Sequence, residues 1–503
     1  MTAPVRLDGA TLSPEAVERV ARDGAPVELT TEAGRAVEES HAFLRRLVAD
    51  GTPVYGLTTG FGALDGETVP RDLNRAQQRC LLKSHAASVG PPMAEDAVRA
   101  MMTVRANVLA SGLTGVDRQA LDALLAMLNR GVTPVVPSRG SVGACGDLSP
   151  LAHMALPLIG LGRATFGGRE MAGAEALAAA GIAEPAMEGR DGIALINGTE
   201  QTTGIGVLAL LDAERSIVLA EHAAALAMEA MGAVSDSFDE RTALAKPHPG
   251  QIATSGALRR LTEGSATVLP PRPSRLRDAL SLRCIPQVLG AARDAAARAR
   301  VVLTAEINAV NDNPLFGAAD GFVTSNSGNF HGQHAAEALD QLATAMISVA
   351  VMSERRSARL VDPHHNGGLP AFLIHPGGVA GRDHGFMIAQ YTAASLVAEM
   401  RMAAIPASIQ SIPTCANTED HVPMAPLAAQ RAARLGDDAL TVVAIEALLA
   451  AQGVDLRGIA PAPALRPLHA AIRERVPPMV EDRVIADDIA AVREKLGALA
   501  RTL

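Results

Sequence analysis

Six long segments of this sequence carry apolar residues at the three- and four-residue spacing of an amphipathic helix. They are rich in alanine and leucine, and several exceed twenty residues, which is long for helices of globular proteins. Helices that are apolar around much of their circumference must be buried among other helices. The sequence therefore predicts a mainly α-helical fold with a central bundle of long helices, drawn from residues 72–89, 117–131, 205–231, 287–310, 334–356 and 385–403.

Strand-like runs are short and few. Residues 25–30 and 52–59 have the composition of strands and are flanked by turn signals. Because no charge run, low-complexity linker or internal repeat marks a boundary, the sequence predicts only a coarse division. We expect a smaller N-terminal α/β portion over residues 1–200, the long-helix bundle over residues 201–425, and a C-terminal helical portion over residues 426–503.

Composition and charge exclude several classes of protein. The 503 residues are 48% hydrophobic and 20% charged, as in globular proteins. A net charge of −9 argues against a general nucleic-acid partner. The first residues lack a basic segment followed by an apolar one, and charged residues interrupt the apolar run 205–234 too often for a bilayer span. We therefore expect a cytoplasmic protein with no membrane or nucleic-acid partner.

The loops between the long helices are rich in glycine, proline and asparagine, and such loops usually carry functional sites. None contains the glycine pattern of a nucleotide-binding loop. His331 and His334 would share one helix face, but no glutamate takes the catalytic place of a zinc-protease motif, so no metal is expected. The spacing of the four cysteines indicates neither a disulfide framework nor a zinc site: Cys80, Cys145, Cys284 and Cys415.

One loop, residues 136–150, places Cys145 between Ala144 and Gly146. Three interpretations of this cysteine are open: a small buried hydrophobe in a turn, a thiol nucleophile, or part of a ring made by the backbone. If the nitrogen of Gly146 attacks the carbonyl carbon of Ala144, a five-membered ring forms, and only glycine leaves that nitrogen uncrowded. Loss of water, and of the Cys145 sulfur as hydrogen sulfide, leaves an electrophilic exocyclic methylene.

The segment GSVGACGDLSPLAHM resembles the one that forms 4-methylideneimidazol-5-one (MIO) in the histidine and aromatic amino-acid ammonia-lyases, where the triad is usually Ala-Ser-Gly. Further motifs follow in the family's order across about residues 50–430, among them VYGLTTGFG, LLKSHAASVG, ALINGTE, NDNPLF, SGNFHG and NTEDHVPM. The resemblance implies MIO formed autocatalytically from Ala144, Cys145 and Gly146, and a small amino acid as substrate. It also implies a fold of the ammonia-lyase (fumarase/aspartase-like) type in a homotetramer whose sites combine loops from several subunits.

The resemblance also assigns residues. Tyr55 matches the loop tyrosine that takes the β-proton, and Arg283 the arginine that grips the substrate carboxylate. Asn197 matches a pocket amide, Phe330 the aromatic beside the ring, and Glu419 a pocket carboxylate. His85 resembles the pocket of the histidine- and tyrosine-type enzymes, which favours a polar substrate over phenylalanine.

Three residues depart from the family's pattern. Cys145 replaces the usual serine, and its sulfur can still leave. Leu280 stands where a second tyrosine is usual, and Arg277 where glutamine is usual. The main prediction is therefore a lyase nearest to histidine ammonia-lyase, with two alternatives: a 2,3-aminomutase, or a diverged homologue with altered or lost activity.

Overall fold

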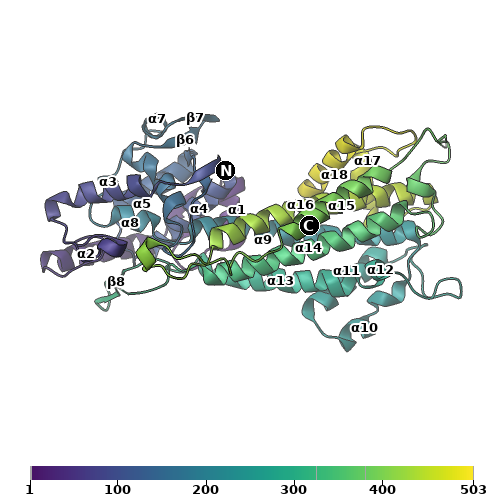
Figure 1. The fold of residues 1–503 in the computed structure, drawn as a ribbon, viewed down its shortest axis with the longest axis horizontal. Coiled ribbons are helices and arrows are strands. Elements are labelled where there is room, and N and C mark those ends of the chain that lie inside the picture. Colours follow the sequence, from purple (N-terminus) through teal and green to yellow (C-terminus); the bar gives the residue numbers. More distant parts are fainter. Residues whose placement is uncertain (1–2, 325, 380, 502–503) are drawn as a thin grey trace. The chain divides into compact units, whose positions relative to one another are not determined.

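Helices account for most of the chain in the computed structural model, which describes residues 3–324, 326–379 and 381–501 (Figure 1). All six segments with helical spacing form helices, and the mainly α-helical fold is confirmed. They correspond to α3 (Asn74–His85), α5 (Arg118–Arg130), α9 (Glu200–Met231), α13 (Ile285–Glu306), α14 (Gln333–Val361) and α15 (Met387–Met402).

The chain divides into two units. Unit 1 comprises residues 1–209, 299–340 and 406–430, and unit 2 comprises residues 210–298, 341–405 and 431–503. The boundary falls inside α9, α13, α14 and α16 (Ala425–Arg457), so each of these helices contributes residues to both units. The three-part division expected from the sequence remains a prediction.

Unit 1 holds the shorter helices of the N-terminal half. Contacts join α1 (Pro14–Arg22) to α4 (Glu95–Ala110), and α4 is buried nearly all round. Helices α3, α6 (Leu148–Ala155) and α8 (Asp191–Ile196) contact one another in pairs. The loops at the ends of these three helices are thereby brought together. Unit 1 also contains α2 (Thr31–Ala49), α5 and α7 (Gly173–Ala179).

The strands of unit 1 form four small sheets. β1 (Val5–Leu7) pairs in parallel with β2 (Val27–Leu29), with Val5 opposite Val27. The other pairings are antiparallel: β3 (Val89–Pro92) with β5 (Pro137–Arg139), β4 (Thr133–Pro134) with β6 (Arg163–Phe166), β6 with β7 (Arg169–Ala172), and β8 (Leu315–Gly317) with β9 (Phe322–Thr324).

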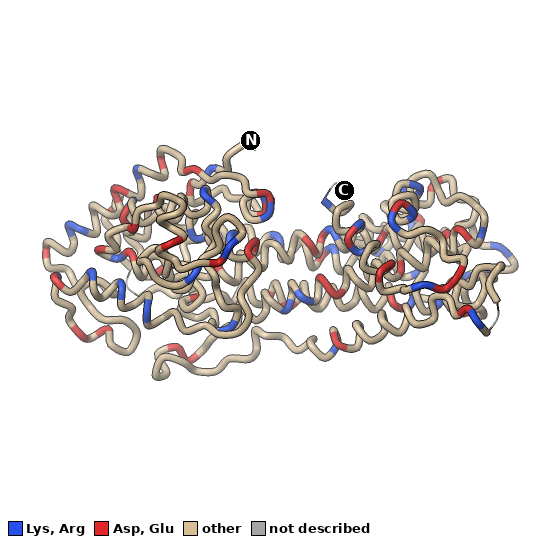
Figure 2. The backbone as a smooth tube through the Cα atoms, turned by 90° about the horizontal axis from the view of Figure 1, so that it is seen from above, with Lys and Arg blue, Asp and Glu red and all other residues tan. Residues whose placement is uncertain are grey.

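In its described residues unit 2 consists of helices and connecting loops, with two isolated β-bridges, Val234 to Leu269 and Arg272 to Arg275. Besides its portions of the four shared helices it contains α15 and the shorter helices α10 (Glu240–Ala245), α11 (Pro249–Thr262), α12 (Leu280–Arg283), α17 (Arg466–Arg475) and α18 (Ile485–Ala500). A buried ion pair joins Arg356 on α14 to Glu446 on α16, and both side chains are fully buried. Lys and Arg positions are interspersed with Asp and Glu positions along the backbone of both units (Figure 2).

One sequence-based expectation needs correction. Residues 25–30 contain β2, but residues 52–59 form turns, with one isolated bridge from Thr59 to Thr68. The glycines that follow Tyr55 favour turns over a continuous ladder. By length and composition alone, α14 and α16 are long and apolar enough to cross a membrane. Their most apolar stretches are 56% and 78% buried within the chain, as in core helices.

Candidate active site

The loop with the Ala144-Cys145-Gly146 triad runs from β5 to α6. It is fastened by backbone hydrogen bonds to two distant segments of unit 1. The nitrogen of Gly332 donates to the oxygen of Gly143 at 3.1 Å, and the nitrogen of Gly146 donates to the oxygen of Phe330 at 3.0 Å. The nitrogen of Met424 donates to the oxygen of Val142 at 2.9 Å. Long-range contacts therefore define the shape of this turn.

Gly146 occupies a position that only glycine can fill. Its φ is +63°, and an added Cβ would lie 2.2 Å from the backbone oxygen of Gly198. Gly198 is equally confined, because a Cβ there would lie 2.3 Å from Nη1 of the buried Arg105. A tight turn with an uncrowded glycine nitrogen is what cyclisation of the triad requires. The residues present therefore fit the MIO group.

The Cys145 thiol donates to Oε1 of Glu419, with Sγ and Oε1 2.6 Å apart. Burial raises the pKa of Cys145 well above its usual value, and the adjacent Glu419 carboxylate raises it further. A thiol in this state is a poor nucleophile, because nucleophilic attack needs the thiolate. The geometry therefore argues against the interpretation of Cys145 as a thiol nucleophile.

Glu419 is held from its second oxygen as well. Oε2 accepts a hydrogen bond of 2.6 Å from Oγ1 of Thr414, and a β-bridge joins the backbones of these two residues. Glu419 lies in a loop ahead of α16, so its carboxylate does not cap a helix. Thr414 was not singled out in the sequence, although it lies five residues before the glutamate.

Tyr55 lies on a turn that contacts the loop of Glu419 through the short helices Gly62–Leu64 and Cys415–Asn417. The backbone nitrogen of Gly62 donates to the Tyr55 phenol oxygen at 2.9 Å. Burial raises the pKa of Tyr55, the Gly62 N–H opposes that shift, and the nearby Cys145 adds to it. Cys145 is therefore close enough to Tyr55 to affect the pKa of its phenol.

Asp147, next to the triad, is fully buried, and burial raises its pKa to about 7. Its Oδ1 accepts from Oγ of Ser141 at 2.8 Å, and its Oδ2 accepts from the nitrogen of Thr202 at 2.8 Å. The side chain makes no capping hydrogen bond to α6. An acid with a pKa near 7 beside the triad can both take up and release a proton near neutrality.

Asn197 is buried at the end of α8, with its amide engaged inside the chain. Nδ2 donates to Oδ1 of Asp312 at 2.8 Å and to the oxygen of Asn313 at 3.1 Å. Asp312 is in turn held by both terminal nitrogens of the buried Arg190. Both amide protons of Asn197 are therefore used before any substrate binds.

A second buried ion pair supports the loop that follows α8. Nη1 of Arg105 lies 2.8 Å from Oε1 of Glu200. Sequence reasoning missed both pairs. Glu200 and Asp312 do stand inside the quoted segments ALINGTE and NDNPLF, where a charge among small residues was the available signal.

His85 and Phe330 are half-buried in unit 1. Nδ1 of His85 lies 2.9 Å from the oxygen of Leu81. Burial lowers the pKa of His85, and the charge of Glu419 opposes that shift, so the two side chains are close enough to interact. Phe330 is not a core residue, and its backbone oxygen is the acceptor for Gly146.

The last three predicted site residues belong to unit 2. Leu280 and Arg283 bound α12, and Arg277 precedes it. All three side chains are exposed, and Leu280 is 60% exposed. Their roles in a site remain predictions.

His331, considered as a metal ligand, stacks on His421 with ring centroids 5.3 Å apart. Within the described residues, no group of three or more histidine, cysteine, aspartate or glutamate side chains is arranged to hold a metal ion.

The chain matches a known protein family and named relatives over most of its length. A model of the aromatic amino acid lyase family matches residues 12–474. The histidine ammonia-lyase of Symbiobacterium thermophilum is 48% identical over 487 residues, which cover 97% of this chain and 95% of that protein. The match therefore extends over nearly the full length of both proteins.

Solved structures agree with this result. The tyrosine aminomutase from Streptomyces globisporus has a TM-score of 0.94 and 37% identity, covering 99% of this chain and 97% of its own. The histidine ammonia-lyase from Trypanosoma cruzi has a TM-score of 0.91 and 34% identity, covering 99% of this chain and 94% of its own. Both a lyase and an aminomutase thus share this fold.

Proposed function

Because this chain belongs to the aromatic amino acid lyase family and is a carbon–nitrogen lyase, we propose that it eliminates ammonia from histidine or a polar or aromatic analogue. The product is an α,β-unsaturated acid. The observation that carries this proposal is the arrangement around the triad. Cys145 contacts the carboxylate of Glu419, and the phenol of Tyr55 lies in the same electrostatic neighbourhood.

We propose that MIO forms from Ala144, Cys145 and Gly146 without an added reagent. The nitrogen of Gly146 attacks the carbonyl carbon of Ala144, and the ring closes with loss of one water. Hydrogen sulfide then leaves from the Cys145 side chain. Phe330 supports the attack, because its oxygen accepts the Gly146 N–H and increases electron density on the nitrogen. Asp147, with a pKa of about 7, is suited to move the protons.

Once formed, the group would supply an electrophilic methylene that would make the substrate amine a better leaving group. The chain's own residues do the remaining work. Tyr55 removes the β-proton as its phenolate, a form that the Gly62 N–H stabilises by donating to the oxygen. Arg283 binds the substrate carboxylate with its planar pair of donors.

Substrate preference follows from the polar groups near the triad. His85 and Glu419 interact electrostatically and offer hydrogen-bonding partners to an imidazole or another polar side chain. A site built from such groups rejects a ligand that leaves them unpaired. We therefore propose that histidine or a polar analogue is the substrate and phenylalanine a poor one.

A 2,3-aminomutase is the second candidate. It performs the same elimination and returns ammonia to the β-carbon, giving a β-amino acid. The high structural similarity to a tyrosine aminomutase favours keeping it. The two activities are separated by the product, a conjugated acid or a β-amino acid.

We further propose that the enzyme is a cytoplasmic homotetramer. The exposed positions of Arg277, Leu280 and Arg283 are compatible with use by a neighbouring subunit. Size-exclusion chromatography with light scattering tests the assembly directly.

The decisive experiment is the intact-protein mass together with the near-ultraviolet spectrum, which is free of tryptophan absorbance because the chain has none. The mass should be lower than the sequence mass by one water plus one hydrogen sulfide per chain. Cys145→Ser should keep the absorbance, and Cys145→Ala should lose it. An unmodified mass with a titratable thiol at position 145 would refute ring formation.

A panel of α-amino acids tests the substrate. Ammonia release and the product are measured for histidine, its polar analogues, tyrosine and phenylalanine. Histidine or a polar analogue should give the highest kcat/KM. If phenylalanine exceeds every polar candidate, the assignment of His85 and Glu419 is wrong.

A further inference from the structure

A cavity of about 330 Å³ lies in unit 1 between α2 and the segment that carries Tyr55. Its volume is in the range of small-molecule sites, roughly 300–1,000 Å³. Residues from α2 form one wall, and Leu57, Thr58 and Val69 form the opposite wall. The cavity is therefore distinct from the Cys145 turn, yet it borders the loop of the proposed catalytic base.

The lining combines an apolar body with positive charge. The apolar side chains are Leu44, Val48, Ala49, Leu57 and Val69. Arg45 and Arg71 add two guanidinium groups. Within the described part of the chain, no aspartate or glutamate lines this cavity. Both arginines are exposed, and with no acid in the lining the cavity favours an anion over a cation.

The two arginines retain free donors. A guanidinium has five N–H donors. Among the described residues Arg45 makes no hydrogen bond or ion pair, and Arg71 makes one hydrogen bond, from Nη2 to the oxygen of Val48. Donors of this kind bind carboxylates and related anions in pairs.

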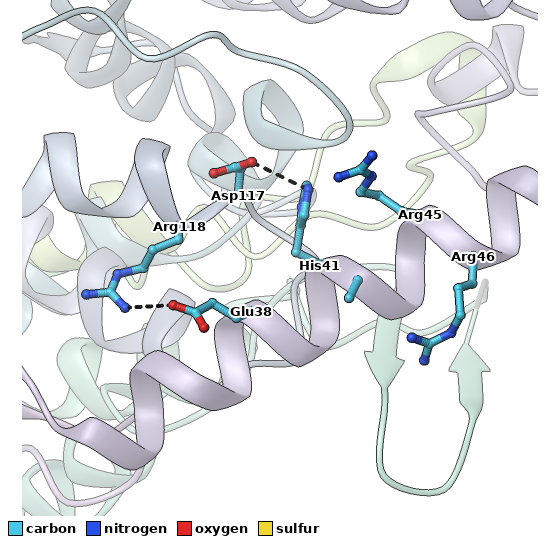
Figure 3. Close-up of a pocket in the computed structure, with 7 residues that line it drawn as sticks. Glu38, His41, Arg45, Arg46, Asp117 and Arg118 are labelled. Atoms are coloured by element: carbon cyan, nitrogen blue, oxygen red, sulfur yellow. Dashed lines mark hydrogen bonds and ion pairs between the residues drawn. The ribbon is translucent and has the colours of Figure 1, made fainter.

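The adjoining hollow on α2 shows the contrast (Figure 3). It shares His41 and Arg45 with the cavity, but its acids are already matched to its bases. Arg118 lies 3.3 Å from Glu38, and Nε2 of His41 lies 3.4 Å from Asp117. Arg45 and Arg46 make no hydrogen bond or ion pair with the other residues drawn in Figure 3. The unmatched positive charge of Arg45 therefore remains available at the border of the two spaces.

We propose that this cavity is a second ligand site, which binds a small organic anion with a flat apolar body. The anionic group pairs with Arg45 and Arg71, and the apolar body lies against Val48, Leu57 and Val69. The site needs no MIO group and no turnover. It is therefore independent of the proposed reaction.

Occupancy has a structural consequence for the Tyr55 loop. Thr58 lines the cavity and also accepts from the nitrogen of Val54 at 2.8 Å, through Oγ1. The nitrogen of Val69 donates to the oxygen of Thr58 at 2.9 Å. A ligand against Thr58 and Val69 restrains these bonds, and should slow amide hydrogen exchange over residues 54–69.

The test uses 4-fluorobenzoate as the probe, titrated into the full-length protein and followed by fluorine NMR. Arg45→Gln should weaken binding about tenfold through loss of a charge-assisted pair. Arg46→Gln is the matched control, since Arg46 lies next in the same helix and lines only the adjoining hollow. It should leave the affinity unchanged. Amide exchange over residues 54–69 should slow with the probe in the wild type and not in Arg45→Gln.

Two other probes define the ligand class. 4-Fluorobenzamide keeps the flat body without the charge, and inorganic phosphate keeps the charge without the body; both should bind much more weakly. Probe binding that Arg45→Gln does not weaken belongs to another site and overturns the proposal. Tighter binding of phosphate than of 4-fluorobenzoate overturns the apolar part of the assignment.

Discussion

The triad loop and the Tyr55 loop are both glycine-rich, but they are held in different ways. The triad loop is fastened by backbone hydrogen bonds to residues far away in sequence, Phe330, Gly332 and Met424. The Tyr55 loop is closed mainly by bonds within itself, such as Gly60 to Glu67 and Val69 to Thr58.

Two glutamines of α3 anchor the Tyr55 loop from outside. Nε2 of Gln78 donates to the oxygen of Gly56 at 3.0 Å, and Nε2 of Gln77 donates to the oxygen of Thr59 at 2.9 Å. A turn fixed by distant segments suits a group that must form once and stay in place. A loop with local closure and few outside bonds suits a base that moves with substrate binding.

The largest effect should come from the glycine of the triad. Gly146→Ala places a Cβ against Gly198 in a left-handed conformation, so the turn cannot keep its shape. We expect no ring absorbance, an unprocessed mass and no measurable turnover. Gly62→Ala is the matched control in the Tyr55 loop: it is also left-handed, but its Cβ would meet only the Cys415 sulfur, at 2.8 Å. That variant should keep the ring. Equal loss of ring in both variants would remove the distinction between the loops.

Tyr55→Phe should come next. Removal of a general base typically costs about 10²–10⁴-fold in rate. The ring should form normally, because the phenol accepts its hydrogen bond from Gly62, which lies outside the triad. Turnover is measured with the best substrate, and ring content from the near-ultraviolet spectrum. Wild-type turnover in this variant would place proton removal elsewhere, and loss of the absorbance would indicate misfolding.

How far the sequence predicts this molecule can be argued from the same two loops. The helices were predictable because their spacing is a local property, and the triad because its motif is contiguous. The bond from Cys145 to Glu419 joins residues 274 positions apart, and no local pattern indicates it. The buried pairs Arg105–Glu200 and Arg190–Asp312 were missed for the same reason, since an ion pair depends on folding that brings two distant charges together.

Residues 52–59 do not form the predicted strand, because side chains there make hydrogen bonds within a turn instead. Thr58 bonds back to Val54 within four residues, which competes with ladder formation.

The pH dependence separates the loops by a smaller effect. Burial raises the pKa of Tyr55 above its usual value of about 10, and the proposed base is its phenolate. Below that pKa only the ionised fraction is active, so kcat should rise with pH, up to about tenfold per unit, across pH 7–9. The ring absorbance should stay constant across the same range. A kcat that falls with rising pH would contradict the phenolate assignment.

The smallest effect concerns Thr414, which orients Glu419. In the proposed ring formation Cys145 would be consumed, so Oε1 of Glu419 would lose its thiol donor and be free to accept from substrate. The hydroxyl of Thr414 then remains as the donor that fixes the carboxylate through Oε2. Thr414→Val removes it and should raise KM by about 5–10-fold, the effect of roughly 1 kcal/mol, with kcat nearly unchanged. Thr414→Ser restores the hydroxyl and should restore KM. A fall in kcat with unchanged KM, or no recovery in the serine variant, would show that Glu419 does not act through substrate binding.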